Sequence, residues 1–117
     1  MKDNQTILEI AVKAADTKKA LDIEVINLIG LSSIADYFLV VSGSNDRQVA
    51  AITMEIEDKL TEAGVEPKHK EGVRGGRWIA LDYGDIIVHI FHQEEREIYG
   101  LEKVWAEGER LDISDWV

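Results

Sequence analysis

The spacing of hydrophobic positions changes several times along the chain, and each change marks a new predicted element. Apolar side chains at helical spacing predict a first helix over residues 4–20: Ile7, Ile10, Ala11 and Ala14. Residues 22–28 then alternate between apolar and polar side chains, which is typical of a half-buried strand. The nearly continuous apolar run at 36–42 indicates a central strand that is buried on both faces.

A second helix is predicted after this strand, up to about residue 63. Gly43 ends the strand, Asn45 is a favourable N-cap, and Gln48 completes a pattern that resembles a capping box. Gly64 is placed to end the helix in a left-handed conformation. The positions expected to face the core recur at helical spacing: Val49, Ile52, Ile56, Leu60 and Ala63.

Three more strands are expected in the second half of the chain. The stretch 65–71 contains the single proline, Pro67, and a strand there would lie at a sheet edge because proline cannot donate to a ladder. A glycine-rich loop at 72–76, expected to be flexible, separates it from strands at 77–83 and 86–92. Only two residues join these last strands, so we expect a hairpin.

Residues 94–106 predict a final helix with three apolar positions turned inward: Ile98, Leu101, and Val104 or Trp105. The tail 107–117 is polar apart from a few apolar positions, and its pattern does not place it. The predicted order is αββαβββα. Helices interleave with strands, and one neighbouring strand pair is a hairpin, so the fold class is α+β or α/β with a mixed sheet covered by helices. A length of 117 residues suits one domain over 1–117.

The charge of the chain is strongly acidic. Asp and Glu number 23 against 13 Lys and Arg, which gives a formal net charge of −10. Such a field repels nucleic-acid phosphates and attracts basic surfaces, of which ribosomal proteins are a large class. The chain has no cysteine, so disulfides, thiolate metal sites and a Cys nucleophile are excluded. No apolar leader or membrane-length segment occurs, and we expect a soluble, cytoplasmic protein.

The predicted hairpin separates its side chains onto two faces. If Gly84-Asp85 is a two-residue loop, Tyr83 lies opposite Ile86 and Ala80 lies opposite His89. One face, which we call the core face, then carries only core-type side chains: Ile79, Leu81, Tyr83, Ile86, Val88 and Ile90. The other face, which we call the aromatic face, combines aromatic, acidic and imidazole groups: Trp78, Ala80, Asp82, Ile87, His89 and Phe91.

Two interpretations of the aromatic face remain open. It resembles a protein-binding surface, on which aromatic anchors dominate the binding energy. Alternatively, helices cover it, and His89 is a core histidine with satisfied hydrogen bonds. A turn longer or shorter by one residue would exchange the two faces, because side chains alternate along a strand.

Catalytic and metal sites are poorly supported by the residue pattern. Residues 42–47 form a Gly-Ser turn before a helix, which can bind phosphate, but no Asp-x-Asp pair follows to hold magnesium. His89 and His92 lie three apart on a strand, so they point to opposite faces. We therefore predict neither an enzyme nor a metal site, and no cofactor is indicated.

Two charged segments have simpler explanations than a binding site. The basic residues near the glycine loop could contact RNA, or they could form a solvated edge that prevents aggregation: Lys68, Lys70, Arg74 and Arg77. The segment 94–97 is expected to be a solvated first helical turn, because acidic side chains are favoured there by the helix dipole.

Two long blocks of the chain resemble one known family. ADYFLVVSGSNDRQVAAI (35–52) and WIALDYGDIIVHIFHQEEREIYGLEKVW (78–105) are similar to the signature blocks of the Iojap/RsfS ribosomal silencing factors, and EGVRGGRW (71–78) matches as well. The second block is specific, because the LDYGD hairpin, the VHIF strand and an E-x-R-x-x-Y-x-L-E-x-x-W helix occur in order. The tail 107–117 lies outside this signature.

The resemblance implies a nucleotidyltransferase-like fold that lacks the metal-binding carboxylates of those enzymes. It also implies binding to the fourteenth protein of the large ribosomal subunit. Occupation of that surface would block joining to the small subunit and repress translation when nutrients are scarce. Organellar relatives act in large-subunit assembly, and free family members are often homodimers.

By family position, the expected partner-binding residues lie on the hairpin. Trp78 is the expected anchor, Asp82 and Asp85 would pair with basic residues, and Gly84 would hold the turn. Tyr83 belongs to the same set, although the predicted register places it on the core face. His89 would either orient Asp82 or contact the partner.

Overall fold

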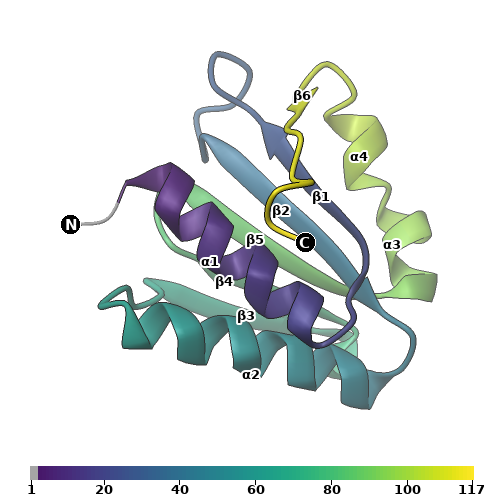
Figure 1. Cartoon of the computed structure of the whole chain (residues 1–117). Helices are drawn as coiled ribbons and strands as arrows, with labels where there is room; N and C mark the ends of the chain where they lie inside the picture. Colours follow the sequence, from purple (N-terminus) through teal and green to yellow (C-terminus); the bar gives the residue numbers. More distant parts are fainter. Residues whose placement is uncertain (1–2) are drawn as a thin grey trace.

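The computed structural model describes residues 3–117 and contains one six-stranded sheet with helices on both faces (Figure 1). The helices are α1 (Asn4–Thr17), α2 (Asp46–Glu62), α3 (Gln93–Tyr99) and α4 (Leu101–Val104), with a 3₁₀ turn, η1, at Arg74–Gly76. The strands are β1 (Leu21–Asn27), β2 (Tyr37–Gly43), β3 (His69–Val73), β4 (Trp78–Asp82), β5 (Ile86–His92) and β6 (Glu109–Arg110). The predicted α+β class and the order αββαβββα are confirmed; α4 and β6 are additions.

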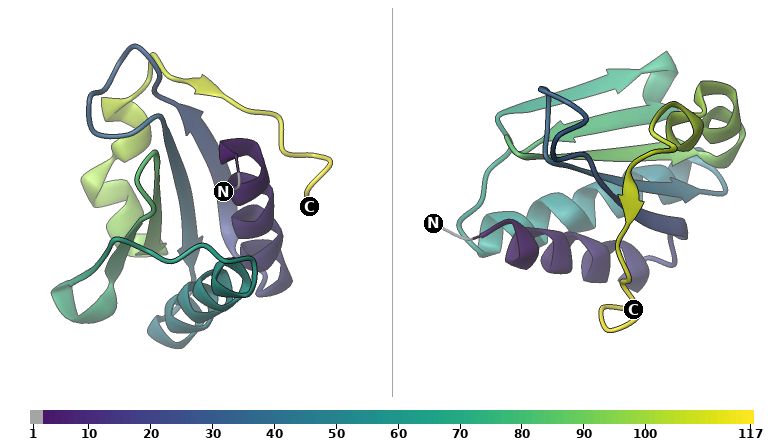
Figure 2. Two further views of the ribbon diagram at one scale, coloured as in Figure 1. Left: turned by 90° about the vertical axis from the view of Figure 1, so that its left-hand side faces the viewer. Right: turned by 90° about the horizontal axis from the view of Figure 1, so that it is seen from above.

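The sheet is mixed, with the strand order β3-β4-β5-β2-β1-β6. Strands β2 and β5 pair in parallel at its centre, and the other pairs are antiparallel. Helices α1 and α2 cover one face, whereas α3 and α4 lie against the other (Figure 2). The predicted central strand 36–42 corresponds to β2, which is buried along nearly its whole length as expected.

Each face of the sheet has its own hydrophobic cluster. The larger cluster lies under α1 and α2 and includes the predicted helix positions Val49, Ile52, Ile56 and Leu60. The smaller cluster lies on the side of α3 and α4: Ile26, Leu28, Ala35, Phe38, Val40 and Phe91. The sheet therefore has a hydrophobic core on each of its faces.

The predicted end signals of α2 are largely confirmed. The Asn45 side chain accepts a hydrogen bond of 2.8 Å from the Gln48 backbone N–H, as an N-cap does. The Gln48 side chain accepts from the backbone N–H of Ser44 at 2.6 Å, one residue before the position that a capping box uses. Gly64 has a φ of +84°, the left-handed conformation expected after the helix.

The hairpin register was predicted correctly. Ala80 pairs with His89, and the Tyr83 N–H donates to the Ile86 carbonyl oxygen at 2.8 Å. The core face is buried as expected, with the exception of Ile79, which is half-buried. The edge position of the third strand is confirmed, because β3 lies at the edge of the sheet. Its bounds were wrong: β3 spans His69–Val73 and not 65–71, so Pro67 lies before the strand.

The predicted helix over 94–106 was wrong in its continuity and in one of its inward positions, Ile98. The helix is interrupted at Gly100, whose φ of +57° ends α3, and α4 begins as a separate short helix. Ile98 therefore points outward and is 71% exposed, whereas Leu101 packs against the smaller cluster as expected. Of the two alternatives at the end of the helix, Trp105 packs against this cluster and Val104 is 67% exposed. Helical spacing that is counted from α3 into α4 does not predict which side chains share a face, because the helix is interrupted between them.

Other boundaries also moved. The first helix ends at Thr17 rather than at residue 20. The loop predicted at 72–76 is shorter than expected, because Gly72 and Val73 pair with β4 and the rest forms the compact turn η1.

The tail that the sequence could not place adds a short edge strand. Strand β6 pairs with β1, and the Leu111 N–H donates to the Val25 carbonyl oxygen at 3.0 Å. Leu111, Ile113 and Trp116 then pack against the larger cluster. No helix within the described residues has the length and apolar character that crossing a membrane requires.

Candidate protein-binding surface

Helices α3 and α4 cover the aromatic face only in part. Phe91 is fully buried and His89 is 6% exposed, so this part belongs to the interior of the protein. Trp78, Asp82 and Ile87 are half-buried and reach the surface. The covered-face interpretation therefore holds for Phe91 and His89, and the rest of the face is accessible, as protein binding would require. The open part presents an indole, an aliphatic side chain and a carboxylate.

The indole of Trp78 is held by three neighbours although it is partly exposed. Its ring stacks on Phe91 with centroids 4.9 Å apart, and its centroid lies 4.3 Å from that of Tyr99. Its Nε1 donates a hydrogen bond of 3.1 Å to Nδ1 of His89. A large aromatic side chain that is both fixed and accessible has the properties of an interface anchor.

His89 does not orient Asp82, so that part of the hypothesis was wrong. Its Nδ1 accepts from Trp78, while Oδ1 of Asp82 accepts from the backbone N–H of Gly84 at 2.8 Å. Burial lowers the pKa of His89 to about 4, because a charged imidazole is poorly solvated there. His89 is therefore neutral at pH 7, and among the described residues its Nε2 has no hydrogen-bond partner.

The turn after β4 depends on Asp82 and Gly84. Gly84 has a φ of +92°, which L side chains rarely adopt, and a Cβ there would lie 3.2 Å from Nζ of Lys68. The Asp85 carbonyl oxygen accepts from the backbone N–H groups of Asp36 and Tyr37 at 2.8 and 3.0 Å. The turn is thus fixed to the start of β2, and Asp85 itself is exposed.

Tyr83 lies apart from the other expected binding residues. Its side chain is on the core face and is 8% exposed. Burial raises the pKa of its hydroxyl well above the ordinary value, and the nearby carboxylates of Glu57 and Glu66 add to this effect. Trp78, Asp82 and His89 share the aromatic face, whereas Tyr83 borders the same turn from behind.

Sequence reasoning did not assign two aromatic residues to this site, although it gave Trp105 as an alternative inward position. Tyr99 at the end of α3 contacts Trp78, and Trp105 after α4 lies 6.2 Å from Phe38 between ring centroids. The Y-x-L-E-x-x-W pattern contained both residues, but one continuous helix would place Tyr99 away from the inward positions that we chose. After the break at Gly100, Tyr99 packs against Trp78 and Trp105 packs against Phe38.

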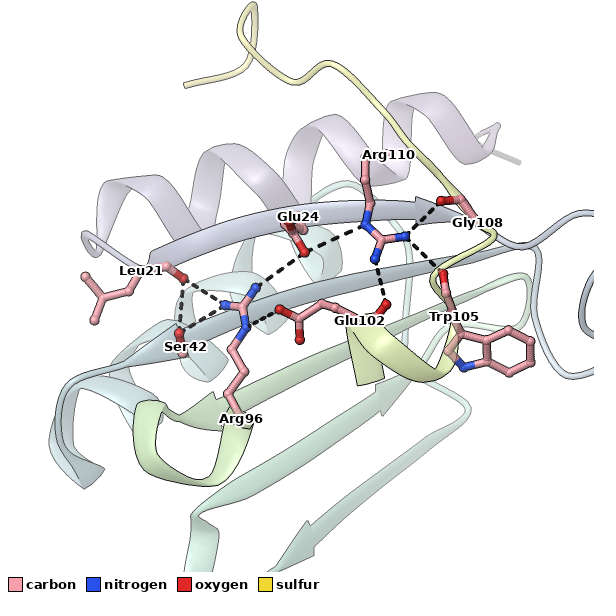
Figure 3. Close-up of polar contacts among 8 residues, drawn as sticks. All are labelled: Leu21, Glu24, Ser42, Arg96, Glu102, Trp105, Gly108 and Arg110. Carbon is pink, nitrogen blue, oxygen red and sulfur yellow. Dashed lines mark hydrogen bonds and ion pairs between the residues drawn. The ribbon is translucent and has the colours of Figure 1, made fainter. Parts of the chain in front are cut away.

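The segment predicted to be a solvated helical turn is partly buried. Arg96 is only 6% exposed, and its guanidinium occupies the centre of a polar network (Figure 3). It donates to the side chain of Glu102 at 3.1 Å and to Oγ of Ser42 at 3.1 Å, and it lies 3.8 Å from Glu24. Arg96 thus connects α3 with α4, β1 and β2. The prediction failed because a charged side chain is normally exposed unless it is paired.

Arg110 extends this network to the C-terminal segment. Its guanidinium donates to the carbonyl oxygens of Glu102, Trp105 and Gly108 at 2.8 to 3.0 Å, and it lies 3.9 Å from Glu24 (Figure 3). These contacts satisfy carbonyl groups at and after the end of α4. The two arginines together hold in place the helices that carry Tyr99 and Trp105.

The Gly-Ser turn lacks the surroundings of a nucleotide site. Ser42 Oγ is already bonded to Arg96 and to the Leu21 carbonyl oxygen. A groove of about 800 Å³ beside it is lined by four acidic side chains, Asp22, Glu94, Glu97 and Glu102, and by two basic ones, Arg96 and Lys103. This balance disfavours a triphosphate. Among the described residues, no group of three or more His, Asp or Glu side chains is placed to hold a metal ion.

Two members of the basic cluster are paired with carboxylates. Lys70 lies 2.8 Å from Glu57, and Arg77 donates to Glu94 and Glu95 at 3.1 Å each. The side chain of Arg74 lies outside the described part of the chain. The pairing of Lys70 and Arg77 favours the solvated-edge interpretation over RNA binding.

Comparison with known proteins assigns the family. The family model described as ribosomal silencing factor during starvation, RsfS, matches residues 1–117. The chain belongs to the RsfS family. Ribosomal silencing factor RsfS of Bacillus subtilis is 43% identical over 111 residues, which cover 95% of this chain and 94% of that relative. The RsfS proteins are regulators and not enzymes, in agreement with the prediction from the sequence.

Solved structures share the fold of this RsfS chain. A crystal structure from Bacillus halodurans matches with a TM-score of 0.81 and 40% identity, covering 93% of this chain and 99% of that one. A crystal structure from Chromobacterium violaceum matches with a TM-score of 0.86 and 31% identity, covering 97% of this chain and 93% of that one. A mouse relative, named mitochondrial assembly of ribosomal large subunit protein 1, is 30% identical over 85% of this chain and 45% of its own length.

Proposed function

We propose that this RsfS-family protein binds the large ribosomal subunit through that subunit's fourteenth protein and blocks joining to the small subunit. Translation would fall under nutrient limitation because the protein competes with the small subunit for one site on the large subunit. No bond is made or broken in this mechanism. The observation that carries the proposal is the half-open aromatic face, on which Trp78 is fixed yet accessible beside Asp82. The proposed location is the cytoplasm.

Charge complementarity supports a basic protein as the partner. The net charge of −10 favours approach to a basic ribosomal protein and opposes direct binding to ribosomal RNA. Electrostatic attraction of this kind raises the association rate and makes it sensitive to salt. We expect affinity for large subunits to fall as ionic strength rises.

Each expected binding residue has a proposed role that fits its position. Trp78 is the anchor, and Asp82 and Asp85 pair with basic side chains of the partner. Gly84 keeps the turn between the two carboxylates in its left-handed conformation. Tyr83 contributes from the core face by supporting this turn.

Cosedimentation with purified large subunits tests the contact surface. The double variant Trp78→Ala, Asp82→Lys removes the anchor and reverses one charge, and we expect it to fold but no longer to sediment with the subunit. The matched control is Met54→Ala, Asp58→Lys, which makes similar changes at exposed positions on α2. Equal sedimentation of the two double variants would show that the aromatic face is not the contact.

A second candidate function is assembly of the large subunit. The name of the mouse relative supports it, because that protein is described as a mitochondrial assembly factor. The two functions differ in what accumulates when the gene is deleted. Incomplete large-subunit particles would favour assembly, whereas complete subunits with excess joining in starved cells would favour silencing.

We also propose that the free protein forms a homodimer, as the family resemblance suggests. Analytical ultracentrifugation of the free chain, with and without large subunits, would determine whether a dimer exists and whether it dissociates on docking.

A further inference from the structure

We propose that His89 is a positioning residue, which fixes the indole of Trp78 in its binding orientation before the partner arrives. This inference rests on the proposed function, in which Trp78 is the anchor. His89 would act through Trp78 and would not itself touch the partner. Its imidazole is 6% exposed, which agrees with a role behind the contact surface.

The hairpin register brings the two side chains together. Trp78 pairs with Phe91 and Ala80 pairs with His89, so Trp78 and His89 are diagonal neighbours on the aromatic face. Long side chains at such diagonal positions can reach one another. This placement allows the 3.1 Å hydrogen bond between Nε1 of Trp78 and Nδ1 of His89. A partly exposed indole N–H would otherwise donate to water.

The hydrogen bond determines the protonation of the imidazole. An indole N–H can only donate, so Nδ1 of His89 must carry no proton, and the proton of a neutral ring is on Nε2. Burial keeps the ring neutral well below pH 7, because it lowers the pKa to about 4. The bond is thus available throughout the physiological range of pH.

The other nitrogen of His89 argues against a purely structural role. Nε2 is buried, and it has no hydrogen-bond partner among the described residues. A buried donor without a partner destabilises the fold relative to an apolar side chain of similar size. The contact that imidazole supplies and an apolar side chain cannot supply is the acceptor for Trp78.

Together with the rings of Phe91 and Tyr99, this bond restrains the indole in the free protein. A side chain that is already ordered loses less conformational entropy when the partner docks. Loss of the acceptor should weaken binding to large subunits by roughly two- to tenfold, which corresponds to the cost of ordering one side chain.

A matched pair of substitutions separates the acceptor from the packing. His89→Asn retains a side-chain oxygen near the position of Nδ1, whereas His89→Leu has nearly the same shape and no acceptor. We would measure the dissociation constant for large subunits and the NMR signal of the Trp78 indole N–H, assigned with Trp78→Phe. His89→Leu should weaken binding by the stated factor and shift the indole signal with faster hydrogen exchange. His89→Asn should restore both properties toward wild type.

The full-length wild-type protein gives a test that does not depend on the folding of variants. Imidazole nitrogen shifts should show Nδ1 of His89 without a proton from pH 6 to 8, and the Trp78 indole N–H should exchange slowly. A protonated Nδ1, or an indole that exchanges as fast as an exposed one, would overturn the inference. Unchanged affinity in His89→Leu would also overturn it if Trp78→Ala abolishes binding, and the proposed function would then stand. If Trp78→Ala binds as tightly as wild type, the contact face itself is wrong.

Discussion

The two faces of the β4–β5 hairpin differ in burial and in the interactions that order their side chains. The core face consists of aliphatic side chains and Tyr83, and it is almost completely buried under α1 and α2. The aromatic face is closed at Phe91 and His89 but open at Trp78, Asp82 and Ile87. Apolar burial alone orders the first face. The second face needs ring stacking and hydrogen bonds to order side chains that remain accessible.

The comparison is tested most strongly by truncating one isoleucine on each face of β5. Ile90→Ala on the core face should reduce the free energy of unfolding by about 2–5 kcal/mol, because a fully buried side chain leaves a cavity. Ile87→Ala on the aromatic face should cost about 1 kcal/mol, because that side chain is half-buried. Denaturant unfolding measures both values. Equal losses would mean that the two faces are equally buried in solution.

The second prediction concerns pH. The folded protein keeps His89 neutral down to about pH 4, whereas an unfolded chain takes up a proton near the ordinary value of 6.5. Stability should therefore fall as pH decreases from about 6.5 to about 4, and the loss should level off below that. The lowering from 6.5 to about 4 corresponds to about 3 kcal/mol.

Comparison with His89→Leu isolates this contribution from the other titrating groups. Between pH 7 and pH 4.5, the free energy of unfolding of wild type should decrease by about 2–3 kcal/mol more than that of the variant. If both proteins lose the same stability, His89 is solvated and the aromatic face is more open than described.

The third prediction concerns the network that fixes α3 and α4. Arg96→Met leaves Glu102 and Glu24 without the buried guanidinium and should cost about 2 kcal/mol, less than a fully buried pair because both carboxylates can reach water. Lys103→Met is the control, because Lys103 is exposed on α4. Thermal unfolding measures the loss. Binding to large subunits should weaken as well, since α3 and α4 carry Tyr99 and Trp105.

The smallest effect is expected at the ring that supports the anchor. Tyr99→Leu removes the aromatic contact with Trp78 and should weaken binding by about 1 kcal/mol, roughly fivefold. Ile98→Ala, on the exposed side of α3, should leave binding unchanged. Fluorescence anisotropy of labelled protein titrated with large subunits can resolve this difference. A larger loss in Ile98→Ala would place the contact on the outer side of α3.

Sequence reasoning predicted best where local geometry determines the outcome. The two-residue turn at Gly84-Asp85 defines the hairpin register, and alternation along the strands then separates Trp78 from Tyr83. The same locality explains the correct caps of α2 at Asn45 and Gly64. These features depend on residues that are close in the sequence.

Features that depend on distant segments were missed. Arg96 is buried because Ser42, Glu24 and Glu102 surround it, and the first two are more than 50 residues away in the sequence. The alternation placed His89 and Trp78 on one face, but it could not show that His89 would bond to Trp78 and not to Asp82. The hydrogen-bond partner of His89 depends on side-chain rotamers, which are determined by packing in the folded protein.

The account depends on the aromatic face covering the joining site of the large subunit. Light scattering of subunit joining, measured while the protein is titrated into large subunits, tests this directly. We predict that wild-type protein at saturating concentration prevents joining and that Trp78→Ala leaves it largely undisturbed. Joining that proceeds normally with wild-type protein, or that is inhibited equally by both proteins, would contradict the account.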